Sequence, residues 1–516
     1  MNIVNDAFLA QKSKSKSAKV RSLLNYPVID TDIHTIDFAP LLEDYIAKYG
    51  GVKLVDQVRA HLKEGLSVSA GEWYGYSPDE RRNHRLNRPP FWALPARNTK
   101  DLATAILPKL LYERLQEQGS DYAILYPNIT LFPIHSHRDD LRRVLARAIN
   151  HYNADVYRPY ADRLTPVAVI PLHTPQEGIE ELEFAVRELG LKTAIIPGAV
   201  RRPIKALTVK YPLDKYPELA RHLQYLDFLA LDSEYDYDPF WAKTIELGVN
   251  PTTHSAGMGW SARNSVSNYM FNHIGHFADA SEALAKALFF GGVTRRFPKF
   301  RIALLEGGAA WGANVYTHIV DRWLKRGRDA VQKYNPENID IDTLRGYFTR
   351  YGDDLTRGKH YSKEELLERV YGIAFGFAGR KQNPLEIDDF ALAGIESVED
   401  IRERYVPNFY FGNEADDRTV SHAFNIRATP LKAQVNVIYS SDAGHWDVPE
   451  FNTTLADTWQ LVEDGAISAE NFRQLVFAGP YAFYTANNPG FFRGTAVEAQ
   501  LSKQASSPKS TEKTAA

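Results

Sequence analysis

Short apolar runs alternate with helical patterns along most of this chain, and several of the runs end at a polar residue. The runs lie near residues 28, 121, 165, 192, 249, 301, 409 and 435. They read as continuous apolar segments, which is the pattern of parallel strands covered on both faces. One repeat is well defined, because a strand at residues 165–172, a helix at 175–189 and a strand at 192–197 follow in order. This order predicts a parallel strand pair joined by a crossover helix.

Eight such strands, most of them followed by a helix, predict an α/β fold of the (β/α)₈ TIM-barrel type over residues 26–496. Two large, mainly helical insertions are expected within it, at about residues 41–118 and 325–405. A long doubly wound open sheet is the alternative fold. It is disfavoured because no Gly-x-Gly-x-x-Gly follows the first strand.

The two ends of the chain differ in composition from the barrel. Residues 1–25 contain lysines interleaved with serines and are expected to form a flexible basic arm. Residues 497–516 are rich in Ser, Lys, Thr and Ala and are expected to be a disordered tail.

Charge and composition restrict the possible partners. The chain of 516 residues has a formal net charge of −3, which gives no electrostatic case for nucleic acid or an anionic membrane. The absence of cysteine excludes disulfides, thiolate metal ligands and cysteine nucleophiles. No apolar run of the length of a membrane span and no secretory signal are present, so we expect a cytoplasmic protein.

Residues that bind metals follow four of the predicted strands. Asp32 and His34 end the first strand and are two residues apart, so on a strand they share a face. His254 follows the fifth strand, Glu306 the sixth and Asp442 the eighth. Each residue alone is equally compatible with a turn or a helix cap. Together they point to a divalent metal site, because the carboxyl ends of barrel strands converge at one mouth.

These stretches resemble the amidohydrolase superfamily, in particular the branch that contains aminocarboxymuconate-semialdehyde decarboxylase and the resorcylate-type decarboxylases. The resemblance covers roughly residues 25–310 and 405–490. The matching motifs are Asp30-Thr31-Asp32-Ile33-His34, Asp238-Pro239-Phe240-Trp241 leading to Thr253-His254, the stretch from Gly291 to Ile302 that contains Arg296-Phe297-Pro298-Lys299, Glu306-Gly307-Gly308-Ala309, and Ser441-Asp442.

The resemblance implies one divalent metal ion per chain, zinc first and manganese or iron as alternatives. It implies Asp32, His34, His254 and Asp442 as metal ligands, with His254 and Asp442 also in catalysis. At the end of strand six the decarboxylases usually carry histidine, whereas this chain has Glu306. Glu306 could act as a general base on a metal-bound water. The resemblance puts decarboxylation of a small aromatic or unsaturated acid first, and Glu306 makes metal-dependent hydrolysis the second candidate. A non-catalytic metal-binding barrel is the third.

Further residues are candidates for binding a small-molecule substrate. They are Arg201 and Arg202 after strand four, His173 after strand three, and His445 and Trp446 just past the strand-eight aspartate; each has a structural alternative. His273 and His276 between strands five and six are weaker candidates. Aromatic residues of the first insertion, Trp73, Tyr74, Tyr76, Phe91 and Trp92, could form a lid or a subunit interface. We expect a homo-oligomer, most simply a dimer.

Overall fold

The strands predicted from the sequence are present and lie in two parallel sheets. The computed structural model describes residues 15–65, 71–89, 98–128, 135–136, 138–220, 222–254, 263–334, 338–359, 362–366 and 388–506. One sheet has the order β1-β2-β3 and the other the order β11-β10-β9-β8-β5-β4. Their bounds are β1 Ile29–Thr35, β2 Tyr122–Pro127, β3 Leu164–Pro166, β4 Ala168–Val169, β5 Ala194–Ile195, β8 Pro251–Thr253, β9 Ile302–Leu304, β10 Phe409–Asn413 and β11 Asn436–Tyr439.

The two sheets join at both seams into a (β/α)₈ barrel. At the first seam only Val167 separates β3 from β4, and the Val167 N–H donates to Leu125 O at 3.0 Å. At the second seam the segment after β11 pairs with β1. There the Asp442 N–H donates to Asp32 O at 3.0 Å, and the His34 N–H donates to Ala443 O at 2.8 Å. The expected fold class is therefore confirmed.

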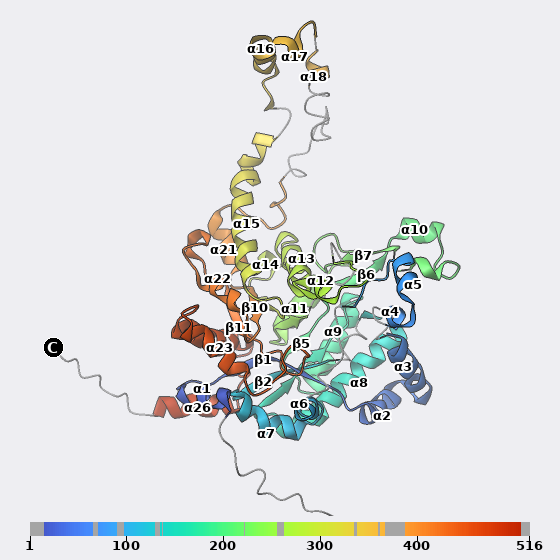
Figure 1. The fold of residues 1–516 in the computed structure, drawn as a ribbon, viewed down its shortest axis with the longest axis vertical. Helices are drawn as coiled ribbons and strands as arrows, with labels where there is room; N and C mark the ends of the chain where they lie inside the picture. Colours follow the sequence, from blue (N-terminus) through green and yellow to red (C-terminus); the bar gives the residue numbers. More distant parts are fainter. Residues whose placement is uncertain are drawn as a thin grey trace, which may run out of the picture.

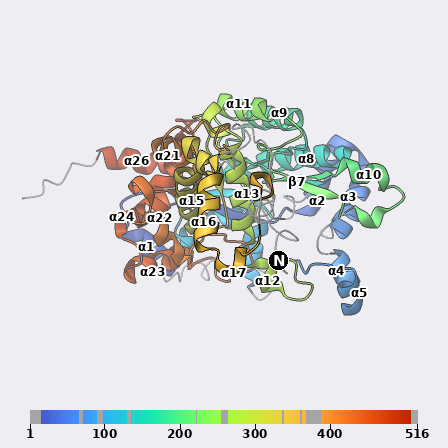
Figure 2. The same ribbon diagram turned by 90° about the horizontal axis from the view of Figure 1, so that it is seen from above.

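Helices cover the outside of the barrel (Figures 1 and 2). The helices that connect successive barrel strands are α8 Asp139–Tyr157, α9 Pro175–Glu183, α11 Asp238–Glu246, α13 His276–Phe290, α15 Ala310–Arg326, α22 Ser421–Phe424 and, after β11, α23 Thr454–Glu463, α24 Ala469–Arg473 and α25 Gly479–Thr485. The strands are apolar because both of their faces are covered, and every residue of β1, β2 and β10 is buried. Among the described residues, no helix is long and apolar enough to cross a bilayer.

The chain between β1 and β2 forms a group of helices, and so does much of the chain between β9 and β10. The first group consists of α2 Ala39–Gly50, α3 Val52–Gly65, α4 Gly71–Gly75, α5 Pro78–Asn83, α6 Thr99–Ile106 and α7 Pro108–Gln118. After α15, the helices α16 Ile341–Tyr351, α17 Asp353–Thr356 and α18 Lys363–Leu366 project away from the barrel, and α21 Val398–Tyr405 returns to it (Figure 1). The connection between β5 and β8 also carries a hairpin that the sequence analysis does not predict, β6 Val200–Pro203 paired antiparallel with β7 Gln224–Asp227.

The described parts of the expected arm and of the expected tail are helical. Part of the expected flexible arm is helix α1 Lys16–Leu23, where the Ser15 side chain caps the Ala18 N–H. Part of the expected disordered tail is helix α26 Ala496–Ser506. Arg21 joins the two, because its guanidinium contacts Asp121 at 2.7 Å and Gln500 at 2.7 Å. Residues 1–14 and 507–516 lie outside the described residues.

Candidate metal centre

Strand β1 brings the first two candidate ligands to the mouth of the barrel. Asp32 and His34 point the same way, and Asp32 Oδ1 lies 3.2 Å from His34 Nε2. The carboxylate of Asp32 also reaches His254 Nε2, at 3.1 Å from Oδ1 and 3.0 Å from Oδ2. His254 directly follows β8, so residues from strands one and five meet as the sequence analysis expects.

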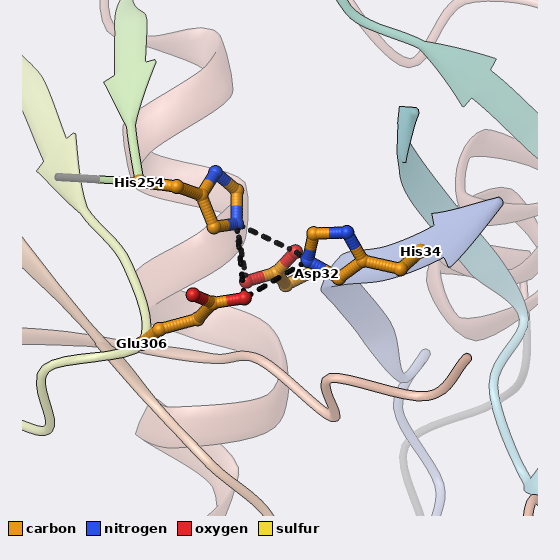
Figure 3. Close-up of side chains that lie close together, drawn as sticks. All are labelled: Asp32, His34, His254 and Glu306. Atoms are coloured by element: carbon orange, nitrogen blue, oxygen red, sulfur yellow. Dashed lines mark hydrogen bonds and ion pairs between the residues drawn. The ribbon is translucent and has the colours of Figure 1, made fainter. Parts of the chain in front are cut away.

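Glu306 belongs to the same cluster of side chains (Figure 3). It comes two residues after β9, and its Oε1 lies 3.0 Å from His34 Nε2 and 3.7 Å from His254 Nε2. Its side chain is 2% exposed. The Glu306 carboxylate is therefore itself a potential metal ligand, and not only a candidate base for a metal-bound water.

Asp442 and His445 complete the cluster from the end of β11. Asp442 Oδ1 lies 3.3 Å from His34 Nε2, and His445 Nδ1 lies 2.7 Å from Asp442 Oδ1 and 3.3 Å from Glu306 Oε1. The His445 ring stacks on His34 with 3.6 Å between centroids. Gly444, at φ 108°, permits this approach, because a Cβ there would collide with the carbonyl oxygen of His34.

Six residues thus form what we call the metal group: Asp32, His34, His254, Glu306, Asp442 and His445. They fall into two overlapping sets of four that share His34 and Glu306, and in each set the donor atoms lie within 4.8 Å of one another. His34 Nε2, Glu306 Oε1 and Asp442 Oδ1 are buried without a hydrogen-bond partner. Buried polar atoms are rarely left without a partner, so this donor set fits a divalent cation.

Close packing of acids and imidazoles shifts the proton affinities in the cluster. Burial alone would raise the pKa of Asp32, but His254 and His34 outweigh it and hold that pKa below its usual range. Burial would lower the pKa of His34, but Asp32 and then Glu306 raise it to about 9. The group therefore stabilises positive charge at the place where these two side chains meet.

Neighbouring carboxylates and burial disfavour the ionisation of two other carboxyl groups, Asp442 and Glu414. Burial, followed by the charges of Glu306 and Asp447, raises the pKa of Asp442 well above its usual range. Glu414, which directly follows β10, behaves likewise, because burial and the charges of Asp447 and Glu306 raise its pKa. Glu414 was not among the candidates from the sequence. Its position at the end of strand seven was the available signal.

A buried hydrogen-bond network holds the two strands that carry most of the ligands. Asp30 Oδ1 accepts the N–H of Asp32 at 3.2 Å and the N–H of Ser441 at 3.0 Å. The Gln118 side-chain amide donates to Asp30 Oδ2 and, at 3.2 Å, to Ser441 Oγ. Asp30 thereby ties the end of β1 to the end of β11, next to Asp442.

Asn128, at the end of β2, is a second residue that sequence reasoning missed. The Nε2–H of His445 donates to Asn128 Oδ1 at 2.9 Å. This bond directs the other ring nitrogen, Nδ1, toward Asp442 and Glu306. Burial, and then the neighbouring His34, lowers the pKa of His445 well below its usual value, so the ring is held neutral.

Two of the proposed substrate residues lie on the β6–β7 hairpin. Arg202 is buried, and its guanidinium contacts Asp227 at 2.6 Å, the Tyr237 hydroxyl at 2.8 Å and the His173 carbonyl at 3.0 Å. These bonds occupy Arg202 in fixing the hairpin to the end of strand three. Arg201 is exposed on the other face of β6. The backbone carbonyl of His173 takes part in this contact with the hairpin.

Trp446 and the two weaker histidine candidates form an aromatic group beside the metal group. The rings of Trp446 and His273 are 5.6 Å apart, and those of His273 and His276 are 5.2 Å apart. Tyr269 stacks on His273 at 5.3 Å and meets Trp446 edge-on at 5.5 Å. Burial, then the neighbouring His273, lowers the pKa of His276 to about 3.

Comparison with known proteins agrees with this arrangement. A model of the amidohydrolase family matches residues 30–341, well over half of the chain. The chain belongs to the amidohydrolase family. This assignment spans β1, β8 and β9, and thus Asp32, His34, His254 and Glu306; the strands that precede Glu414 and Asp442 lie beyond the matched residues.

Solved structures similar to this amidohydrolase include several decarboxylases. A dihydroxybenzoic acid decarboxylase from Polaromonas sp. JS666, solved with manganese and 2-nitroresorcinol, is 14% identical, with a TM-score of 0.49 over 91% of this chain and 99% of that chain. A 5-carboxyvanillate decarboxylase from Novosphingobium aromaticivorans DSM 12444, solved with manganese, is 15% identical, with a TM-score of 0.46 over 89% and 96%. A 2,6-dihydroxybenzoate decarboxylase from Rhizobium is 14% identical, with a TM-score of 0.45 over 90% and 100%.

Proposed function

We propose that this amidohydrolase binds one divalent metal ion and releases CO₂ from a small aromatic or unsaturated carboxylic acid. Asp32, His34, His254 and Asp442 would hold the ion, and Glu306 belongs to both of the donor sets that contain these residues. The observation that carries the proposal is the convergence of buried donor atoms from the ends of strands one, five, six and eight, three of which lack a hydrogen-bond partner. When bound, the ion would supply positive charge to orient the substrate carboxylate and an adjacent oxygen.

The position of Glu306 favours decarboxylation over hydrolysis. A hydrolase of this kind needs a metal that acidifies water and a separate base that accepts the proton. Here Glu306 Oε1 lies 3.0 Å from His34 Nε2, within the donor set. Each set of four donors contains Glu306 and one aspartate, so two carboxylates would lower the effective charge of the ion and weaken its effect on water. Orientation of an acid for loss of CO₂ does not require ionised water.

The donor set also bears on the metal. Each set of four contains two carboxylates and two imidazoles, and the chain has no thiolate. Mixed oxygen and nitrogen sites of this kind suit manganese or iron as well as zinc. Manganese, iron and zinc should therefore all be tested, although zinc comes first from the family resemblance.

Loss of CO₂ leaves an electron pair on carbon, which must take a proton from an acid in the site. Glu414 is the candidate for this acid, because it directly follows β10, burial and the charges of Asp447 and Glu306 raise its pKa, and it lies outside the two sets of metal donors. The proton would pass from Glu414 to the carbon, and water would restore it. His445, held by Asn128, would orient Asp442 during this step.

The test is an assay of the purified protein loaded in turn with manganese, iron and zinc. One panel contains aromatic acids, including 2,6-dihydroxybenzoate and 5-carboxyvanillate, and the other contains amides and lactones. We expect CO₂ release from at least one acid, and loss of that activity in His254→Ala. Hydrolysis of the second panel without any CO₂ would replace the decarboxylase by a hydrolase with Glu306 as general base. Bound metal without turnover in either panel would indicate a non-catalytic barrel.

The proposed setting is a homodimer in the cytoplasm. The composition supports a protein that needs no disulfides, since cysteine is absent. Light scattering on the eluted protein tests the dimer, which would appear at twice the chain mass of 58.4 kDa. Fractionation of the source cells tests the compartment.

A further inference from the structure

The aromatic wall beside the metal group is held by a segment of the first insertion. We call residues 73–88 the strap and residues 263–276 the wall loop. The strap contains α5, and the wall loop contains α12 Tyr269–His273, which lies beside α4 and α5 in both views (Figures 1 and 2). In the sequence, about 180 residues separate the two segments (compare Arg88 with Ser267).

Hydrogen bonds fix the two ends of the strap to the wall loop. At one end the Trp73 Nε1–H donates to Val266 O at 2.8 Å. At the other end the Arg88 backbone N–H donates to Ser265 O at 2.8 Å, and the Arg88 guanidinium donates to Ser267 O at 2.8 Å. The Asn272 side chain donates back to Arg88 O at 2.7 Å. The strap therefore determines the path of the backbone just before α12.

Trp73 is the buried centre of this contact. Its residue exposure is 9%, and guanidinium groups lie over its ring at 3.7 Å from Arg81 and 5.2 Å from Arg88. The guanidinium of Arg88 also lies 6.0 Å from the Tyr269 ring. Cation–π contacts of this kind connect the strap directly to the first ring of the wall.

The wall loop in turn contacts the loop that carries the metal group. Tyr269 and His273 pack against Trp446, at 5.5 and 5.6 Å between ring centroids. His273 Nε2 also lies 3.7 Å from Asp447 Oδ2. Trp446 and Asp447 directly follow His445 in the sequence, so the wall packs against the loop that carries His445.

We propose that the strap holds this wall over the metal group and controls the access of small molecules to it. Trp73 is a positioning residue in this proposal, since it acts through Tyr269, His273 and Trp446. The size and shape of an accepted substrate would then depend on the first insertion. The dependence of substrate size and shape on the first insertion rests on the proposed function, whereas control of access does not.

The experiment compares the wild type with Trp73→Ala and Trp73→Phe, each loaded with Mn²⁺. Phenylalanine keeps an aromatic ring for Arg81, but it lacks the Nε1–H donor and is smaller than the indole. Tyr347→Ala serves as the control, because Tyr347 is a 56% exposed aromatic residue on the distant helix α16. Three quantities are measured: amide hydrogen exchange of residues 263–276, the rate at which EDTA removes Mn²⁺, and the equilibrium affinity for Mn²⁺.

In Trp73→Ala we expect exchange in the wall loop and removal of Mn²⁺ by EDTA to rise by about tenfold, the factor for loss of a hydrogen bond with a cation–π contact. Trp73→Phe should show a smaller rise in both rates, and Tyr347→Ala should show no rise. The Mn²⁺ affinity of all three variants should stay within about twofold of the wild type. Unchanged exchange in the wall loop, or an unchanged rate of metal removal, would overturn the proposal. A fall in the Mn²⁺ affinity of Trp73→Ala as large as the rise in the rate of Mn²⁺ removal would also overturn the proposal, because the strap would then support the ligands themselves. If Trp73→Ala does not fold, Trp73→Phe and Arg88→Met decide by the same criteria.

Turnover provides a separate measurement. With any acid that the wild type decarboxylates, Trp73→Ala should raise KM by about tenfold and leave kcat within about twofold, because it loosens binding and not the metal group. A fall in kcat at unchanged KM would contradict the substrate part of the inference. Failure of the wild type to turn over any acid would refute the proposed function, while exchange and metal removal would still decide the role of the strap.

Discussion

Replacing Asp30 with asparagine should stabilise the metal-free protein at pH 8 and change its stability little at pH 4. Asp30 is fully buried, and burial raises its pKa from 3.8 to about 7, although bonds from Ser441, Gln118 and the Asp32 backbone oppose this shift. The folded state therefore holds a proton on Asp30 more tightly than the unfolded chain does. Stability from this group is complete below pH 3.8 and is lost as the pH rises toward 7.

The size of the effect follows from the two pKa values. A difference of about 3 pKa units corresponds to an upper limit of about 4 kcal/mol of unfolding free energy. Asparagine resembles the neutral acid, so the variant should avoid this loss. Its oxygen can still accept the N–H groups of Asp32 and Ser441. Its amide would need a new acceptor, and Gln118 can supply one by rotating its amide, because Gln118 Oε1 has no hydrogen-bond partner.

Urea unfolding of EDTA-treated protein measures this prediction. The midpoint of Asp30→Asn should exceed that of the wild type at pH 8 and match it near pH 4. Asp30→Ala is the control, since it removes the acceptor of two buried N–H groups and should destabilise the protein at both pH values by about 1–3 kcal/mol. A variant with asparagine that is destabilised equally at pH 4 and pH 8 would refute the reasoning.

Three further predictions concern the metal group and the hairpin. His254→Ala and Asp442→Asn should bind less than about a tenth of the metal of the wild type by elemental analysis, because each removes a donor from a small set; full metal content would refute their assignment as ligands. Glu306→Gln should weaken Mn²⁺ binding in a chelator competition, and unchanged affinity would place Glu306 outside the ligands. Arg202→Met should lower the unfolding free energy by about 3–5 kcal/mol, since it leaves Asp227 buried without its partner. The Mn²⁺ affinity of Arg202→Met should not change, and a lower affinity would show that Arg202 contributes to the metal site.

The barrel could be predicted from the sequence because its strands are buried on both faces. Such strands are continuous apolar runs, and the residues at their carboxyl ends must meet at one mouth. This reasoning located Asp32, His34, His254, Glu306 and Asp442, and the structure brings all five together. Their actual roles as ligands remain predictions for the experiments above.

Contacts between distant parts of the chain could not be predicted in this way. Arg21 pairs with Asp121 and Gln500, so α1 contacts α26 although both helices lie in stretches that are polar and rich in lysine. Arg202 has a buried partner 25 residues away on the next strand of an unpredicted hairpin. Whether a polar residue serves a functional site or stabilises the fold depends on the residue that it contacts. The sequence pattern does not identify that residue.

The orientation of the strand-end carboxylates depends on backbone conformations that apolar patterns do not reveal. Glu306 and Asp442 both lie in the left-handed region, at φ 57° and 55°. This region disfavours L-residues by roughly 1–2 kcal/mol each, and glycine would adopt it without this penalty. A turn at these positions could therefore be made more easily by glycine, but glycine carries no carboxylate. Both positions hold a carboxylate in a strained conformation with an oxygen buried in the metal group, which is the arrangement expected of residues that serve the site.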